Sequence, residues 1–215
     1  MDKKTPVYGL TGNMGCGKST VAKFFAEFGD VAVIDADKTA KELLRSEENR
    51  PELEKLFGLE IFTDGQMDTK KLGRLVFSNR VVLMKLENFI HPLVRQKVAE
   101  MTKPRPGISF FLVEAALIFE TGWQDLKIRR ERENGFIWEK FFDAVIAVTC
   151  AEPEQHRRLR ETRNITSDEI ARRLHRQMST REKIRRADFT INTDCPSEEV
   201  KRRVGNLYCR LKNKN

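Results

Sequence analysis

The sequence lacks a long hydrophobic segment, and it is poor in the residues that build disulfide or metal frameworks. Its longest apolar run, residues 108–119, is interrupted by Ser109 and Glu114 and falls short of the roughly 18 residues that a membrane span needs. The four cysteines show no close pairing and no C-x-x-C pattern, so neither a disulfide framework nor a zinc site is predicted. The first predicted strand begins at Val7, directly after MDKKTP. We therefore expect no signal peptide and a cytoplasmic protein.

The composition is that of an ordinary globular protein with an excess of positive charge. The 215 residues, 40% hydrophobic and 33% charged, suit one domain or one domain with an insertion. Residues 127–186 contain 16 Lys and Arg against 10 Asp and Glu, which accounts for most of the net charge of +8. Such a stretch can bind nucleic acid, can surround a polyphosphate or can be a solvated helical surface. Composition leaves these three open.

Apolar runs alternate with helical patterns along the chain, which predicts a parallel sheet with crossover helices. The five predicted strands are residues 7–10, 31–34, 108–113, 144–148 and 189–191. In the core, helices are predicted at residues 19–28, 153–163, 167–181 and 197–211, the last with Ser197 as its N-cap, and a turn at 162–167. The fold class is α/β, a three-layer fold in which helices flank a five-stranded parallel sheet.

The residues between the second and third predicted strands show no strand pattern. Helical patterns cover residues 36–44, 51–57, 70–77 and 80–101. Because such a segment is too long for a loop, we interpret residues 36–104 as a helical insertion that forms one wall of a cleft. Residues 1–35 and 105–215 then form the core that contains the predicted sheet.

The strongest motif is GNMGCGKS, residues 12–19, which fits the G-x-x-x-x-G-K-[ST] phosphate loop between a predicted strand and a predicted helix. Glycines let the backbone amides converge on phosphate oxygens, and the helix N-terminus adds its dipole. Lys18 is expected to reach the β and γ phosphates, and the Ser19 hydroxyl to bind Mg²⁺. The residues expected to hold ATP are Gly12, Asn13, Met14, Gly15, Cys16, Gly17, Lys18, Ser19 and Thr20. Cys16 either has a thiol pKa lowered by nearby donors or fills a small position.

Carboxylates follow two of the predicted strands. Asp35 and Asp37 lie just beyond the second strand, and Glu114 ends the run ISFFLVE. Ligands of α/β sheets collect at the carboxyl ends of the strands. One aspartate can therefore be the base that a kinase needs and the other a helix cap or water ligand, or both can cap the next helix. Glu114 is a candidate for holding metal-bound water.

Taken together, the sequence resembles the dephospho-coenzyme A kinase family nearly from end to end. The segments that carry the resemblance are GLTGNMGCGKST (9–20), VIDADKTAKELL (33–44), DGQMD (64–68), KLGRLVF (71–77), LENFIHPLV (86–94), ALIFETG (116–122) and FDAVIAV (142–148). Single positions follow toward the end, namely Gln155, Arg158, Gln177, Lys183, Asp188 and Asn192. The phosphate loop is common to many families, whereas IDAD, His91-Pro92 and the last four positions are more particular.

The resemblance implies transfer of the γ-phosphoryl group of ATP to the ribose 3′-hydroxyl of dephospho-coenzyme A, the last step of coenzyme A synthesis, with Mg²⁺. It implies a nucleotide core, a helical substrate domain and an arginine-bearing lid at residues 153–181. It matches Asp37 to the base that faces the acceptor, and it raises the prospect that His91 contacts the substrate. Catalysis is assigned to Asp37, Lys18 and Arg158, substrate binding to Asp37 and His91, and the metal to Ser19 and Glu114.

Some positions depart from the family pattern. Thr69 stands where arginine is expected, Ala116 replaces a proline, and residues 126–140 look like an insertion. We interpret the insertion as a surface helix or hairpin, with an oligomer contact through its aromatic residues as the alternative.

Two other functions remain open. One is a P-loop kinase for nucleosides or nucleotides. The other is a nucleic-acid-binding ATPase that uses residues 127–186, although no aromatic residue for base stacking lies between Phe142 and Phe189. A GTPase is disfavoured because no N-K-x-D-like segment is present. We expect a small-molecule partner, no nucleic acid and no membrane; the sequence leaves monomer or homo-oligomer undecided.

Overall fold

The computed structural model describes residues 5–132, 135–163, 170 and 174–213. The chain divides into two compact units: Met1–Ile34 with Lys103–Asn215 (unit 1), and Asp35–Thr102 (unit 2). Of the proposed lid, residues 164–169 and 171–173 lie outside the described residues. None of the helices in the described part of the chain combines the length and hydrophobicity that a membrane crossing requires.

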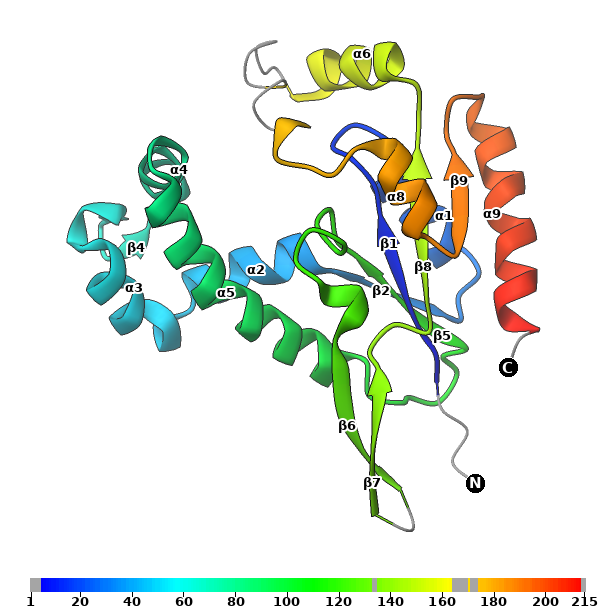
Figure 1. Ribbon diagram of the computed structural model, residues 1–215, viewed down its shortest axis with the longest axis horizontal. Coiled ribbons are helices and arrows are strands. Elements are labelled where there is room, and N and C mark those ends of the chain that lie inside the picture. Colours follow the sequence, from blue (N-terminus) through cyan, green and yellow to red (C-terminus); the bar gives the residue numbers. More distant parts are fainter. Residues whose placement is uncertain (1–4, 133–134, 164–169, 171–173, 214–215) are drawn as a thin grey trace. The chain divides into compact units, whose positions relative to one another are not determined.

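Unit 1 is built on a five-stranded sheet with the strand order β2-β5-β1-β8-β9. The strands are β1 (Val7–Thr11), β2 (Val31–Asp35), β5 (Phe110–Glu114), β8 (Ala144–Thr149) and β9 (Phe189–Asn192). β1 pairs in parallel with β5 and β8, and β8 pairs in parallel with β9; Figure 1 shows their common direction. Every residue of β1, β5 and β8 is buried, as expected for inner strands covered on both faces. The five predicted strands are confirmed.

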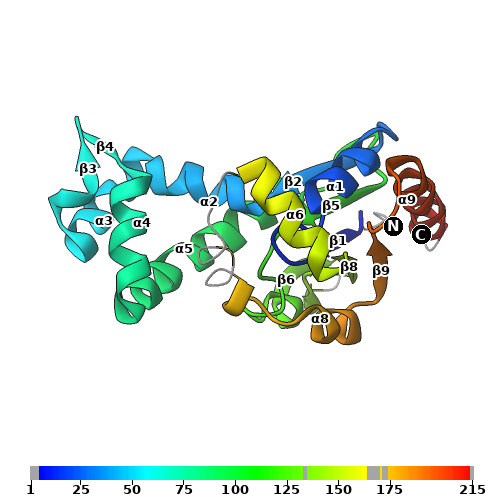
Figure 2. The same cartoon turned by 90° about the horizontal axis from the view of Figure 1, so that it is seen from above.

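Helices cover both faces of this sheet, which confirms the three-layer α/β fold. The helices of unit 1 are α1 (Lys18–Ala26), α6 (Glu152–Arg163), α8 (Thr180–Arg186) and α9 (Ser197–Lys212), of which α6 lies beyond the end of β8 (Figure 1). Figure 2 shows α1 and α8 on opposite sides of the sheet. α1 packs beside α9, and the Phe28 ring that follows α1 stacks on Tyr208 with centroids 3.8 Å apart.

Two aspartates fix the beginnings of the inner strands. Asp143 accepts a 2.8 Å hydrogen bond from the amide of Val7, and Asp188 accepts one of 2.8 Å from the amide of Val145. Each also donates its own amide to the carbonyl of the same partner residue. The reciprocal pairs set the register at the strand ends that lie away from the phosphate loop.

The insertion at residues 126–140 is a two-stranded antiparallel ribbon. β6 (Lys127–Arg132) pairs with β7 (Gly135–Lys140) from Lys127 opposite Lys140 to Arg132 opposite Gly135. The amide of Phe141 donates to the carbonyl of Leu126 at 2.8 Å and closes its base. This confirms the hairpin interpretation.

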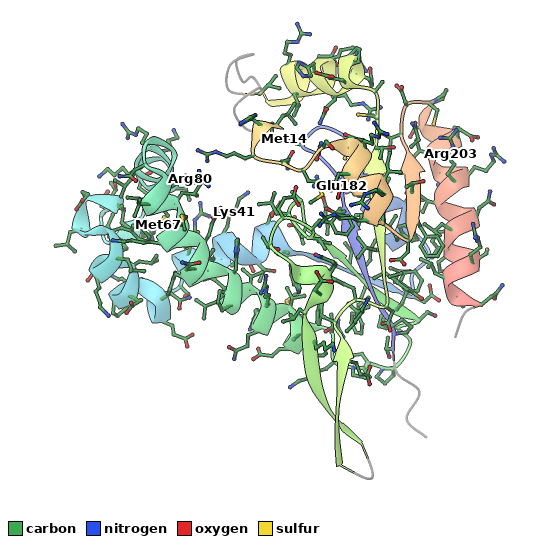
Figure 3. The ribbon with its side chains drawn as sticks, viewed as in Figure 1. Met14, Lys41, Met67, Arg80, Glu182 and Arg203 are labelled. Carbon is green, nitrogen blue, oxygen red and sulfur yellow. The ribbon has the colours of Figure 1, made fainter. Side chains whose placement is uncertain are left out.

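Unit 2 is helical, with α2 (Ala36–Arg45), α3 (Arg50–Phe57), α4 (Thr69–Ser78) and α5 (Arg80–Met101). α2 and α4 pack against α5 around a small core of Leu53, Phe57, Ile61, Met67, Leu72 and Val76; Figure 3 labels Met67 in this unit. Asp68 caps α4 and Asn79 caps α5 through side-chain oxygens. Four predicted helices are thus confirmed.

Three details of the prediction were wrong. Unit 2 contains a short ribbon, β3 (Phe62–Thr63) with β4 (Gln66–Met67), because Asp64 and Gly65 both take positive φ and make a tight turn. The helix predicted at residues 167–181 is broken, since residues 176–179 are not helical and Ser179 caps α8. Pro196 rather than Ser197 is the N-cap of α9, because the Pro196 carbonyl accepts the first helical hydrogen bonds, from the amides of Glu199 and Val200. The predicted turn at 162–167 falls mostly outside the described residues.

Candidate active site

The phosphate loop connects β1, the central strand of unit 1, to α1. Gly12, Gly15 and Gly17 have φ of +150°, +83° and +88°, a region that side-chain-bearing residues rarely adopt. A Cβ at Gly12 would lie 2.3 Å from the carbonyl oxygen of Val148, and one at Gly15 would lie 2.7 Å from Leu159 Cγ. Space as well as backbone angle therefore requires glycine at these two positions.

Lys18 folds back over the loop. Its Nζ donates to the carbonyl oxygens of Gly12 at 2.9 Å and Asn13 at 3.4 Å. The ammonium group therefore lies on the concave side of the loop, where an anion would meet both this charge and the N-terminus of α1.

Ser19 and Glu114 meet at the carboxyl end of the sheet. The Ser19 hydroxyl donates a 2.8 Å hydrogen bond to Oε1 of Glu114, and Glu114 is 8% exposed as the last residue of β5. The structure thus brings together the two residues that the sequence predicted for the metal. In the described part of the chain, no group of three or more His, Cys, Asp or Glu could hold a metal on its own.

Cys16 is buried inside the loop. Burial raises the pKa of its thiol above the usual 9.0, although Lys18 acts in the opposite direction. The alternative of a low-pKa, reactive thiol is therefore wrong, and Cys16 fills a small position beneath Gly12.

Arg158 lies on α6 against the end of the phosphate loop. Its guanidinium donates to Thr193 Oγ1 and to the Thr193 carbonyl, each at 2.8 Å, and to Glu154 at 2.7 Å. Hydrogen bonds from Arg157 and Arg158 hold the pKa of Glu154 at about 2, so Glu154 stays ionised. A Cβ at Gly17 would lie 3.4 Å from the Arg158 guanidinium. The arginine charge is therefore adjacent to the loop.

Thr193 links this arginine to the loop, and sequence reasoning missed it. Its hydroxyl donates to the carbonyl of Cys16 at 2.8 Å, and its amide donates to the carbonyl of Thr149 at 2.8 Å. The residue directly follows β9, so its place at a strand end was the available signal.

The late motif residues have structural partners in unit 1. Gln177 accepts from the amide of Met14 at 2.9 Å, and Lys183 donates to the Ala116 carbonyl at 2.7 Å and pairs with Glu120 at 2.9 Å. Burial lowers the pKa of Lys183, and the hydrogen bond to Glu120 opposes this. Glu120 was another residue that the sequence did not single out.

Ala116, where the family pattern has proline, accepts the hydrogen bond from Lys183 through its backbone carbonyl oxygen. That oxygen also accepts from Thr11 Oγ1 at 3.2 Å. Proline offers the same carbonyl group, so the replacement preserves these bonds. Thr69 is the first residue of α4, directly after the Asp68 cap.

Asp35, Asp37 and His91 belong to unit 2. Asp35 is the N-cap of α2 and accepts a 2.9 Å hydrogen bond from the amide of Lys38, which confirms that one aspartate caps the helix. Asp37 lies exposed in the first turn of α2. Burial lowers the pKa of His91 on α5 below 6.5 with a contribution from Arg95, while Glu87 opposes the shift. His91 is therefore neutral at neutral pH.

The parallel sheet, the glycine-rich loop and its lysine define a P-loop kinase fold. A solved structure of TT1252 from Thermus thermophilus is similar, with 28% identity, a TM-score of 0.79 and coverage of 97% of this chain and 99% of that one. A dephospho-CoA kinase from Campylobacter jejuni shares the fold at 24% identity and a TM-score of 0.59, covering 97% and 98% of the two chains.

Sequence comparison identifies the family. The family model of dephospho-CoA kinase matches residues 6–130 and 133–199. The dephospho-CoA kinase of Carboxydothermus hydrogenoformans is 33% identical over 207 residues, which cover 93% of this chain and 91% of the relative. The chain belongs to the dephospho-CoA kinase family.

Proposed function

We propose that the protein transfers the γ-phosphoryl group of ATP to the ribose 3′-hydroxyl of dephospho-CoA, giving CoA and ADP in the final step of CoA biosynthesis. The observation that carries the proposal is the complete phosphate loop, with Lys18 folded over it and Ser19 hydrogen-bonded to Glu114, in a chain of this family. Phosphoryl transfer depends mainly on positioning and charge neutralisation, and these groups supply both.

The loop residues Gly12 to Thr20 bind the triphosphate in this proposal. Their backbone amides and the N-terminus of α1 orient the β and γ phosphates, and Lys18 exchanges its loop carbonyls for phosphate oxygens. Arg158, beside Gly17, adds positive charge from α6. Charge stabilisation of this kind acts most strongly where donors are fixed before the reaction.

Oxygen donors at the loop fit magnesium. Mg²⁺ prefers hard oxygen ligands and is usually held by one or two protein groups together with water and substrate phosphates. The Ser19 hydroxyl and the buried Glu114 carboxylate form such a set, Ser19 as a direct ligand and Glu114 through metal-bound water. When bound, the ion would neutralise negative charge on the triphosphate.

Unit 2 supplies the acceptor side of the reaction in this proposal, and unit 1 is the nucleotide-binding core. Asp37 orients the 3′-hydroxyl and accepts its proton, because Asp35 is already engaged as the cap of α2. His91 contacts the acceptor in this proposal. The lid at residues 153–181 limits access of water to the phosphoryl group. We also propose a cytoplasmic location, where ATP is available.

A substrate panel tests the function. The protein is incubated with ATP and Mg²⁺, and ADP formation is measured with dephospho-CoA, adenosine, nucleoside monophosphates and pantothenate derivatives. We expect turnover with dephospho-CoA and a CoA product with one added phosphate on the ribose. Turnover of a nucleoside monophosphate alone would favour the nucleotide-kinase alternative. Hydrolysis stimulated by nucleic acid in a salt-sensitive way would favour the ATPase alternative.

A further inference from the structure

The peptide groups of one phosphate-loop residue, Met14, are held by two glutamine side chains. Gln155 Nε2 donates to the Met14 carbonyl at 2.6 Å, and Gln177 Oε1 accepts from the Met14 amide at 2.9 Å. The Met14 side chain is 9% exposed and packs in one cluster with Leu159, Ile170 and Leu174. Figure 3 labels Met14 beside the segment that leads into α8.

The backbone dictates what each glutamine must present. A carbonyl oxygen only accepts, so Gln155 must offer its NH₂ group; an amide N–H only donates, so Gln177 must offer its oxygen. The two glutamines are therefore not interchangeable in their chemistry. A carboxylate could replace the amide at 177, where an acceptor is needed, but not at 155, where a donor is needed.

The loop needs outside support at this point because Met14 lies between two glycines of positive φ, Gly12 and Gly15. Glycine has more accessible backbone conformations than any other residue, so a glycine-rich loop gains little rigidity from its own chain. Fixing the intervening peptides from outside supplies the missing rigidity.

Both glutamines have further contacts within unit 1. Gln155 is 5% exposed in the first turns of α6. Beside Gln177, the amide of Met178 donates to Glu120 Oε1 at 2.7 Å. Glu120 is in turn paired with Lys183, which is 1% exposed. Met14 thus contacts α6 on one side and, through Gln177 and its neighbour Met178, the ion pair of Glu120 with buried Lys183 on the other.

We infer that Gln155 and Gln177 are positioning residues for phosphoryl transfer, which fix the tip of the phosphate loop at Met14; the inference rests on the proposed function. Neither residue needs to touch ATP. Their loss would let the loop amides move relative to the phosphates, and a displacement of about 1 Å can cost roughly 100-fold in rate.

Five variants test the inference. Gln155→Met and Gln177→Met keep the length of the side chain and remove the hydrogen bond. Gln155→Glu and Gln177→Glu add the same charge at both positions. Only the glutamate at 177 can still make its hydrogen bond, because that position needs an acceptor. Gln96→Met, at an exposed position on α5, is the control for replacing a glutamine by methionine. Each is assayed for kcat, KM for ATP, direct ATP affinity and melting temperature between pH 6 and 8.5.

Both methionine variants should lose about 10- to 100-fold in kcat/KM for ATP while remaining folded, and Gln96→Met should match wild type. Gln177→Glu should recover most of what Gln177→Met loses. Gln155→Glu should stay impaired at pH 8.5 and gain activity relative to wild type as the pH falls, because a protonated carboxyl can donate again.

Equal behaviour of the two glutamate variants would overturn the inference, as would methionine variants within twofold of wild type. The inference would also be overturned if the loss of activity across the variants were explained entirely by their lower melting temperatures. The wild-type assay reports separately on the proposed function: if wild type does not phosphorylate dephospho-CoA, that function fails, while the ATP affinities of the variants still test the loop positioning.

Discussion

The hydroxyl of Ser19, in the first turn of α1, donates a 2.8 Å hydrogen bond to the carboxylate of Glu114, the last residue of β5. The two residues are 95 positions apart in the chain. The bond joins the helix that begins at the phosphate loop to the strand beside β1. It places a buried carboxylate next to the hydroxyl that we propose as a magnesium ligand.

Glu114→Gln should raise the Mg²⁺ concentration for half-maximal turnover by about 10- to 100-fold, the usual cost of losing an outer metal partner. Glutamine can still accept from Ser19, so the variant removes charge and leaves the hydrogen bond. Turnover is measured against Mg²⁺ at fixed ATP, with the exposed Glu48→Gln as control. An unchanged Mg²⁺ requirement would show that Glu114 only anchors Ser19.

Lys18→Ala should remove nearly all transfer and leave the melting temperature close to that of wild type. Its ammonium is the loop cation proposed to neutralise the moving phosphoryl group. The matched control is Lys23→Ala, at an exposed position of the same helix. A kcat of Lys18→Ala above about a tenth of the wild-type value would contradict the role that the motif assigns to this lysine.

Asp37→Asn should keep ATP binding and lower kcat by about 10²- to 10⁴-fold, the usual worth of a positioned base. The low end is expected because a loose transition state requires little of the base. Asp35→Asn should retain activity and stability, because asparagine also caps helices, whereas Asp35→Ala should cost about 1 kcal/mol of unfolding free energy. Stopped turnover in Asp35→Asn with full activity in Asp37→Asn would reverse the two assignments.

Asp30 should contribute stability that is lost in acid. Burial alone would raise its pKa, but hydrogen bonds from Lys212, Ser109 and Tyr208 lower the pKa below its usual 3.8. A lowered folded-state pKa means that the contribution is present above about pH 4 and disappears as the pH falls through the folded-state pKa. The difference in melting temperature between wild type and Asp30→Asn should therefore shrink from pH 6 to pH 2. A constant difference would mean that the charge of Asp30 contributes nothing.

Replacing residues 127–140 by a two-residue Asn-Gly turn should leave transfer within about tenfold of wild type, since surface connections tolerate such changes. The bond between Phe141 and Leu126 already closes the base of the ribbon at 2.8 Å. Activity and oligomeric state are measured together. A folded variant of unchanged oligomeric state that has lost activity would assign the ribbon to the active site.

The parts of the prediction that succeeded depend on neighbours in the chain. The phosphate loop is specified within residues 12–19, because glycine conformation and the placement of a lysine and a serine are local properties. A cap at one of the two aspartates was foreseen, and Asp35 is that cap because it accepts from an amide only three residues away. Buried strands were visible as short apolar runs.

The prediction failed where distant contacts override local preference. Residues 167–181 have a helical pattern, yet the Met178 amide bonds to Glu120 and the Gln177 side chain bonds to Met14. These contacts accompany a break in the helix before Thr180. The positions of Thr193 and Glu120 had no local signal of comparable strength.

The sequence by itself determined the phosphate loop, the five strands of the main sheet, the four helices of unit 2, and the family. Only the tertiary structure decided what Gln155, Gln177 and Lys183 do, because their partners lie 141, 163 and 67 residues away. The role of a hydrogen-bond donor or acceptor depends on the group that it contacts. These contacts depend on how the sheet and its helices pack, and no local pattern of residues encodes them.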